Sequence, residues 1–212
     1  MDGARAADGL YLAYPLAHSL AILVAVDAFS YLSVLLSIIL GLGLTQILTA
    51  SGRLIRHRER VRADWLPLLW AAVLLIIYVQ VWWSMFGLRL HRDWTFLAFL
   101  TVLTQTGTLY LMAAVVLPEQ VEDPGVDLRV YYERNHRWLF GFFLATLVIS
   151  VVKDVVLGGH LPTRINLAFH ALLAAVCIVG LLVRGRRVHE LLAITCAGAI
   201  AIYIGILFTH LA

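Results

Sequence analysis

The chain has 212 residues, a formal net charge of +3 at pH 7 and 62% apolar residues, with a mean hydropathy of +0.90. This composition excludes an ordinary water-soluble globular protein. The charged residues fall in short clusters between long apolar runs, which is typical of a protein that crosses a membrane several times. Because the positive charge is concentrated in loops, it indicates topology and not a surface that binds nucleic acid.

The N-terminal segment, residues 1–27, contains one apolar run at 10–26 that is interrupted by Pro15 and His18. Three interpretations compete for this run: a seventh spanning helix, an interfacial helix, or a signal sequence with small residues at the cleavage-type positions. The basic stretch that opens a signal sequence is nearly absent. We therefore expect an additional spanning helix.

Six further apolar segments are long enough to cross a bilayer core of about 30 Å, which needs roughly 20 helical residues. They are residues 28–52, 66–90, 94–117, 137–158, 163–184 and 187–209. Pro67 lies in a predicted first helical turn, and Gly158, Gly159 and Pro162 mark a helix boundary. We predict an all-α integral membrane protein, with residues 28–212 forming a single domain of six core transmembrane helices.

The longest connection, residues 118–136, begins acidic and continues as LRVYYERNHRW. Asp127 is a candidate N-cap for a short interfacial helix before the fourth core span. The tyrosines and the tryptophan of this stretch suit the headgroup zone of a membrane.

The arginines predict the orientation of the chain. The loops after the first, third and fifth core helices carry eleven arginines, whereas the facing loops carry three. The positive-inside rule therefore places the Arg-rich loops in the cytoplasm and the C-terminus outside. The runs YLSVLLSIILGLGLTQILTASGRLI, WWSMFGLRLHRDWTF and RINLAFH look like those of small bacterial inner-membrane proteins in general. That resemblance implies a bacterial inner membrane and carries no activity.

The first core helix has a small or hydroxylated residue at every fourth position: Ser33, Ser37, Gly41, Thr45 and Thr49. Such a stripe lets two helix backbones approach closely in a right-handed crossing. A hydroxyl-lined pathway is the alternative. We expect helix packing, because small residues are the usual interface between membrane helices.

The other core helices carry polar residues at helical spacing. The sets are Gln80, Ser84 and Gly87; Thr101, Gln105 and Thr108; Thr146, Ser150, Lys153 and Asp154; Asn166, His170 and Cys177; Cys196 and Tyr203. At 1.5 Å per residue, the most polar members lie about 18 to 26 Å from the cytoplasmic helix ends. The sequence therefore predicts one polar layer in the outer half of the membrane, formed by Gln80, Gln105, Lys153, Asp154, His170 and Tyr203.

An ionisable side chain inside a membrane is a candidate functional residue. Lys153 has an equal alternative, because its long side chain can reach the outer headgroups. Asp154 is too short to do so, which favours a functional role. His170 has no second histidine at matching depth in the six core spans, which argues against a bis-histidine haem site.

No sequence motif identifies a reaction. HExxH, GxGxxG and GxxxxGK[ST] motifs are absent, and no Ser-His-Asp set can be assigned. The sequence predicts no metal and no cofactor, and it leaves open whether the protein is an enzyme. Cys177 and Cys196 are expected to be reduced packing residues on neighbouring helices.

The leading functional hypothesis is a channel or carrier that moves an ion or small polar molecule through the polar layer. The alternative is a non-catalytic membrane subunit, assembly factor or sensor with a structural polar core. A membrane-embedded enzyme or redox protein ranks third. Membrane lipids are expected partners, and a homo-oligomer and a cytoplasmic or membrane partner at the Arg-rich loops are left open.

Overall fold

Six long helices make up most of the computed structural model, which describes residues 28–91, 93–121 and 123–207. They are α2 (Ala28–Arg56), α3 (Trp65–Met85), α4 (Phe96–Val116), α5 (Leu128–Gly158), α6 (Arg164–Leu182) and α7 (Arg186–Leu207). Each is long and apolar enough to cross a membrane, which indicates a multi-pass membrane protein as the sequence predicted. The seventh helix expected at 10–26 lies outside the described residues.

The helix boundaries follow from local capping. Asp64, Thr95, Asp127 and Thr163 precede α3, α4, α5 and α6, and each side chain accepts a hydrogen bond from a backbone N–H in the first turn. Helix α5 ends at Gly158 and is capped by Gly159, whose φ of 68° is left-handed. Glycine adopts this conformation without the steric cost that a Cβ would add.

Helix α5 is longer than predicted. The sequence analysis placed a separate interfacial helix before a span at 137–158, but the structure has one continuous helix of 31 residues from Leu128 to Gly158. The predicted N-cap at Asp127 is confirmed. The division was wrong because no proline interrupts this stretch, so the backbone hydrogen bonds continue through the change from polar to apolar side chains.

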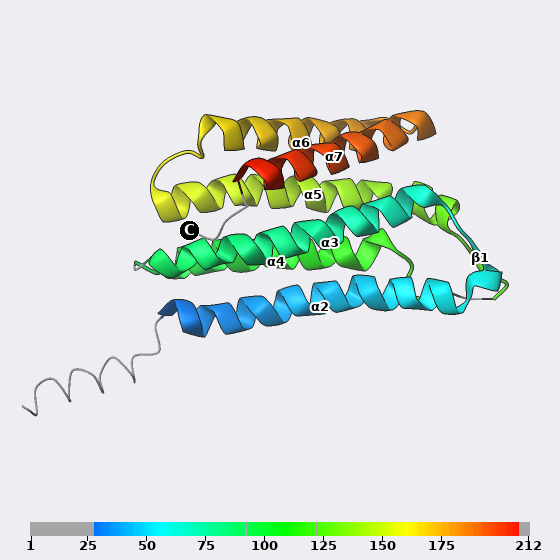
Figure 1. Ribbon diagram of the computed structural model, residues 1–212, viewed down its shortest axis with the longest axis horizontal. Coiled ribbons are helices and arrows are strands. Elements are labelled where there is room, and N and C mark those ends of the chain that lie inside the picture. Colours follow the sequence, from blue (N-terminus) through cyan, green and yellow to red (C-terminus); the bar gives the residue numbers. More distant parts are fainter. Residues whose placement is uncertain (1–27, 92, 122, 208–212) are drawn as a thin grey trace, which may run out of the picture.

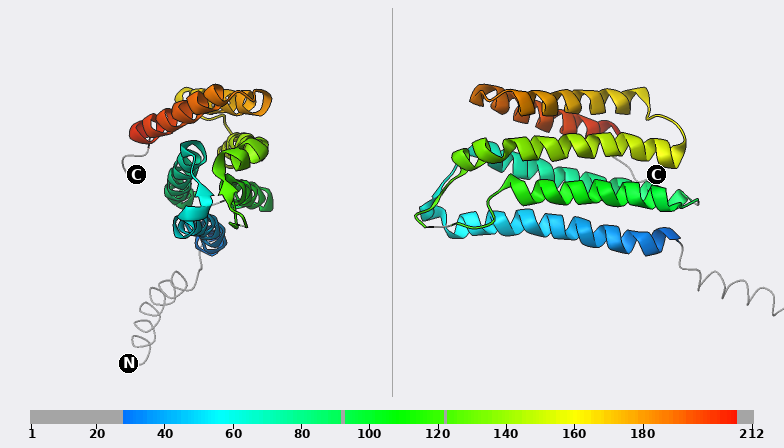
Figure 2. Two further views of the ribbon diagram at one scale, coloured as in Figure 1. Left: turned by 90° about the vertical axis from the view of Figure 1, so that its right-hand side faces the viewer. Right: turned by 180° about the vertical axis from the view of Figure 1, so that it is seen from behind.

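The helices form an antiparallel bundle (Figure 1). Helix α2 lies at one edge against α3 and α4, and α6 and α7 lie together at the other edge. Helix α5 contacts α4 and α6, and α7 returns to contact α3. Figure 2 shows the same arrangement along the helix axes and from behind. The centre of the bundle is filled by fully buried side chains such as Tyr78, Phe140 and Leu109.

The two ends of the bundle differ in their connections. The α2–α3, α4–α5 and α6–α7 connections lie at one end, which we call the Arg-rich end. There η1 (Arg58–Arg60) and β1 (Val61–Arg62) follow α2, and β1 pairs in parallel with β2 (Val126–Asp127). The opposite end holds η2 (Phe86–Leu90) and the α5–α6 connection.

The small-residue stripe of α2 faces away from the bundle. Ser37, Gly41, Thr45 and Thr49 are exposed, and a Cβ added at Gly41 would meet no atom within 4 Å. The side of α2 that packs within the chain is instead formed by Leu36, Leu40, Gly43, Ile47 and Ala50. The described helices of this chain therefore do not pack on the stripe, and its role in helix packing stays a prediction. Leu36, Leu40 and Ile47 bury apolar area in this interface, and Gly43 leaves the space that the Tyr78 side chain occupies.

Candidate functional site

A cavity of about 380 Å³ lies between α3, α4, α5, α6 and α7. We call it the polar cavity. Its hydrogen-bonding residues are Gln80, Ser84, Gln105, Thr106, Thr146, Ser150, Lys153, Asp154, Asn166, His170 and Tyr203. The lining also includes Gly87 and Leu88 of η2, so the cavity extends toward the end opposite the Arg-rich end.

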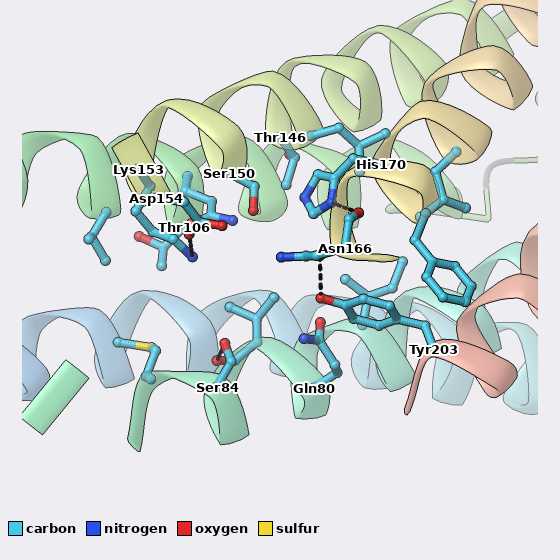
Figure 3. A pocket seen from close by; sticks show the side chains of 18 of the residues that line it. Gln80, Ser84, Thr106, Thr146, Ser150, Lys153, Asp154, Asn166, His170 and Tyr203 are labelled. Carbon is cyan, nitrogen blue, oxygen red and sulfur yellow. Dashed lines mark hydrogen bonds and ion pairs between the residues drawn. The ribbon is translucent and has the colours of Figure 1, made fainter. Parts of the chain in front are cut away.

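The structure brings all six residues of the predicted polar layer to this cavity: Gln80, Gln105, Lys153, Asp154, His170 and Tyr203. They come from five helices that run in alternating directions, and they line one cavity because their depths match. Figure 3 shows Gln80, Lys153, Asp154, His170 and Tyr203 around it. Thr106 was not singled out from the sequence. It is adjacent to Gln105 and so lies about 100° around the helix, outside a pattern based on i+3 and i+4 spacing.

Two side-chain hydrogen bonds join helices around the cavity. The Tyr203 hydroxyl donates to Asn166 Oδ1 at 3.0 Å, which joins α7 to α6. Thr146 donates to Thr108 at 2.8 Å, which joins α5 to α4. His170 Nδ1 lies 2.9 Å from the Asn166 carbonyl, which can only accept. Nδ1 therefore carries a proton, and in the neutral ring Nε2 is free to accept a hydrogen bond.

Two amides and one hydroxyl in the cavity have unused hydrogen-bonding capacity. Gln80, Gln105 and Ser150 have no side-chain hydrogen bond to any residue that the structure describes. Gln105 is only 6% exposed. Because an unsatisfied buried polar group costs about 1–3 kcal/mol, these groups favour water or a polar ligand in the cavity.

The cavity also contains one cation and one anion. Lys153 Nζ lies 3.8 Å from Asp154 Oδ1, and their side chains are 18% and 29% exposed. Both line the same cavity, although neighbouring residues on a helix differ in direction by about 100°. Because they are adjacent, each charge partly offsets the other. With neutral His170, the lining has no formal net charge.

An aromatic layer closes the polar cavity on the side of the Arg-rich end. The Trp70 ring contacts Phe140 edge to face at 5.2 Å and Phe143 at 6.4 Å between ring centroids. Gly180 gives Phe140 its space, since a Cβ at this position would meet the Phe140 ring at 2.6 Å. Trp70, Phe140 and Phe143 are each at most 3% exposed. The layer is therefore a packed barrier.

Within the described part of the chain, no group of three His, Cys, Asp or Glu side chains is arranged to hold a metal ion. Cys177 and Cys196 are buried and free, on the adjacent helices α6 and α7. No protein-family model, curated protein or solved structure matches the chain.

Proposed function

We propose that the polar cavity binds a small polar molecule without net charge, as one step of carrier-type transport. The unpaired amides of Gln80 and Gln105 carry this proposal, because they offer donors and acceptors that no described side chain uses. Lys153 and Asp154 add a matched pair of charges. Such a lining suits a neutral or zwitterionic solute better than a bare ion.

The size and closure of the cavity favour a carrier over an open channel. A volume of about 380 Å³ falls within the range of roughly 300–1,000 Å³ that is typical of small-molecule sites. The buried rings of Trp70, Phe140 and Phe143 lie between the cavity and the Arg-rich end. Transport through this site would require the layer to rearrange, as in alternating access.

A structural polar core, as in a membrane subunit, assembly factor or sensor, is the second candidate. The Tyr203–Asn166 and Thr146–Thr108 hydrogen bonds support it, because each joins two helices. In that case the polar side chains would hold the helices together, and the cavity would stay dry and take no solute. The two candidates therefore differ in whether the cavity is wet and whether it takes a solute.

We also propose a bacterial inner-membrane location with the Arg-rich end in the cytoplasm, based on the distribution of arginines. His57 and His160 are exposed at opposite ends of the bundle. Cysteines placed at these positions should react with an impermeant maleimide from opposite sides of intact cells. Labelling of position 57 from outside would overturn this orientation.

Cysteine accessibility tests whether the cavity is wet. Ser150→Cys should react with a small water-soluble methanethiosulfonate in detergent-purified protein. Thr104→Cys is the matched control, because Thr104 is exposed on α4, a spanning helix, and lies outside the cavity. In lipid nanodiscs, lipid should cover position 104, so the control cysteine should become unreactive. The cysteine at position 150 should stay reactive, because water in the cavity still reaches it. An unreactive Ser150→Cys in both preparations would favour the structural core.

Ligand binding tests the carrier hypothesis directly. Glycerol, glycine and sodium chloride represent a neutral, a zwitterionic and an ionic probe, and each is added to the full chain while thermal unfolding is followed. A neutral or zwitterionic probe should raise the unfolding temperature and enter proteoliposomes, and both effects should be lost in Gln105→Leu but kept in Thr104→Val. Equal uptake by the two variants would contradict the assignment.

A further inference from the structure

A second cavity of about 420 Å³ lies at the Arg-rich end. It is bordered by Asp64 before α3, the first turns of α5, the connection before α7, and the start of α7. We call it the arginine cavity. The two cavities share no lining residue, and the aromatic layer around Phe140 lies between them. An inference about the arginine cavity is therefore independent of the proposed transport function.

The arginine cavity has a surplus of positive charge. Five arginines and two carboxylates, Asp64 and Glu133, line it, which leaves a formal surplus of three positive charges. Arg129 pairs with Glu133 at 3.0 Å, and Arg186 pairs with Asp64 at 2.7 Å. The surplus therefore resides on the other three arginines.

These three arginines are Arg134, Arg137 and Arg184. None forms an ion pair with a carboxylate among the residues that the structure describes. Arg134 and Arg137 lie on α5, and Arg184 lies before α7, so they approach the cavity from two directions. Guanidinium groups bind phosphate through paired N–H donors. The arrangement provides such donors around one space.

His136 adds a buried polar atom with no partner. The residue is 8% exposed and lines the arginine cavity. Its Nδ1 lies 2.9 Å from the Glu133 carbonyl and must donate to it. Nε2, at the far edge of the ring, has no hydrogen-bond partner within the described part of the chain. A native structure rarely leaves such an atom unpaired.

The neighbouring histidine is different, which makes the free atom of His136 informative. His189 Nε2 lies 2.8 Å from the Val183 carbonyl, and Nδ1 lies 2.8 Å from the Tyr132 hydroxyl. Both nitrogens are thus bonded, and this ring is held 4.9 Å from the His136 ring between centroids. Of the two buried rings, only His136 keeps a nitrogen for a ligand.

We propose that the arginine cavity binds a phosphate group. Arg137 and Arg184 would bind its oxygens, and a protonated His136 Nε2 would donate to a further phosphate oxygen; with a monoester, neutral Nε2 could instead accept from its hydroxyl. Two sources share this chemistry: the headgroup of an anionic phospholipid and a soluble phosphate ester. Trp65 and Trp138 are 44% and 62% exposed at this end, as expected of tryptophans at the level of the lipid headgroups. A lipid headgroup and a soluble phosphate ester can both reach a cavity at this level.

The test uses the purified full chain in neutral detergent, with thermal unfolding as the readout. The probes are glycerol 3-phosphate and short-chain phosphatidylglycerol, with sodium sulfate at equal ionic strength and short-chain phosphatidylcholine as references. At least one phosphate probe should raise the unfolding temperature more than its reference compound does. This rise should level off at high probe concentration. A response to glycerol 3-phosphate identifies a soluble ester as an adequate ligand, and a response to phosphatidylglycerol alone identifies a lipid headgroup.

Matched substitutions distinguish phosphate binding in the arginine cavity from general attraction of an anion to the positive charge at this end. Arg137→Gln with Arg184→Gln should weaken the apparent affinity at least tenfold. Arg56→Gln with Arg58→Gln removes two exposed arginines at the same end, outside the cavity, and should leave the affinity within about twofold. An equal loss in both double variants, or equal shifts with sulfate and phosphate, would overturn the proposal.

A measurement on the unsubstituted protein covers the case in which the double variant does not fold. Phenylglyoxal modifies arginine side chains, and mass spectrometry locates the modified peptides. The responding phosphate probe should slow modification of Arg137 and Arg184 and leave Arg56 and Arg58 unchanged. Uniform slowing of all four, or of none, would contradict a phosphate site in this cavity.

Discussion

The polar cavity and the arginine cavity differ in how their polar side chains are satisfied. In the polar cavity, two amides have no partner among the described residues, and one cation and one anion lie side by side on α5. In the arginine cavity, Arg186 pairs with Asp64 across two elements, Arg129 pairs with Glu133 within α5, and three further arginines remain. The first cavity therefore offers neutral hydrogen-bonding capacity, and the second offers net positive charge. Solutes of different chemistry should select between them.

The comparison requires that the aromatic layer keep the cavities apart. Phe140→Ala removes a fully buried ring from that layer and should lower the free energy of unfolding by about 3–5 kcal/mol. Thermal or denaturant unfolding in micelles measures the loss. Phe96→Ala is the control, because Phe96 is 79% exposed and should cost little. Similar losses for the two variants would show that the layer is not a packed barrier.

Overfilling the same layer should have a smaller effect. Gly180→Ala places a Cβ 2.6 Å from the Phe140 ring and should destabilise the protein by about 1–3 kcal/mol. Gly198→Ala meets nothing within 4 Å and should be neutral or stabilising by up to about 1 kcal/mol, because alanine favours the helix. Thermal or denaturant unfolding in micelles measures the stability of the Gly180→Ala and Gly198→Ala variants. A neutral Gly180→Ala would mean that Phe140 has room to move.

The ion pair between Asp64 and Arg186 sharpens the comparison at the Arg-rich end. Asp64→Asn keeps a side chain that can cap α3 but removes the charge that binds α7, so we expect a loss of about 1 kcal/mol near neutral pH. Asp123→Asn is the control, because Asp123 pairs with Arg60 while 85% exposed. Asp123→Asn should lower the free energy of unfolding by almost nothing. Equal losses in Asp64→Asn and Asp123→Asn would argue against a specific α3–α7 contact.

The Asp64 contribution should also depend on pH. Burial raises the pKa of Asp64, but the hydrogen bonds from Arg186 and the Leu66 N–H and the charge of Arg186 hold the pKa below its ordinary value. A lowered folded-state pKa stabilises the protein above the unfolded pKa of about 3.9, and this stabilisation is lost as the pH falls through the folded pKa. The stability gap between the wild type and Asp64→Asn should therefore close below about pH 4. A gap that is unchanged in acid would contradict this account.

The smallest effect is expected in the polar cavity. Gln105→Leu removes an amide that makes no described hydrogen bond, so the unfolding temperature should stay unchanged or rise slightly. Thr146→Val is the contrasting variant, because Thr146 bonds to Thr108 across helices, and it should cost about 1 kcal/mol. A large loss in Gln105→Leu would indicate a structural amide and weaken the binding hypothesis.

Much of the polar cavity could be predicted from the amino-acid sequence. Gln80, Gln105 and His170 stand out because polar residues are costly in apolar spans, and helical rise alone gave them similar depths. The same reasoning did not find Thr106, and it missed the arginine cavity. That cavity depends on α5 continuing without a break from Leu128 into the span and on α7 returning beside α3, neither of which follows from local periodicity.

The sequence by itself determined the number and approximate limits of the six long helices, because hydropathy, helix length and caps such as Asp127 act within short stretches of chain. Tertiary structure decided which side of each helix packs. The stripe through Gly41 has the spacing of a helix interface, yet Leu36 and Leu40 form the contact and the stripe faces outward. Spacing along one helix shows only which residues share a face. The partner of that face is set by the packing of all six helices together.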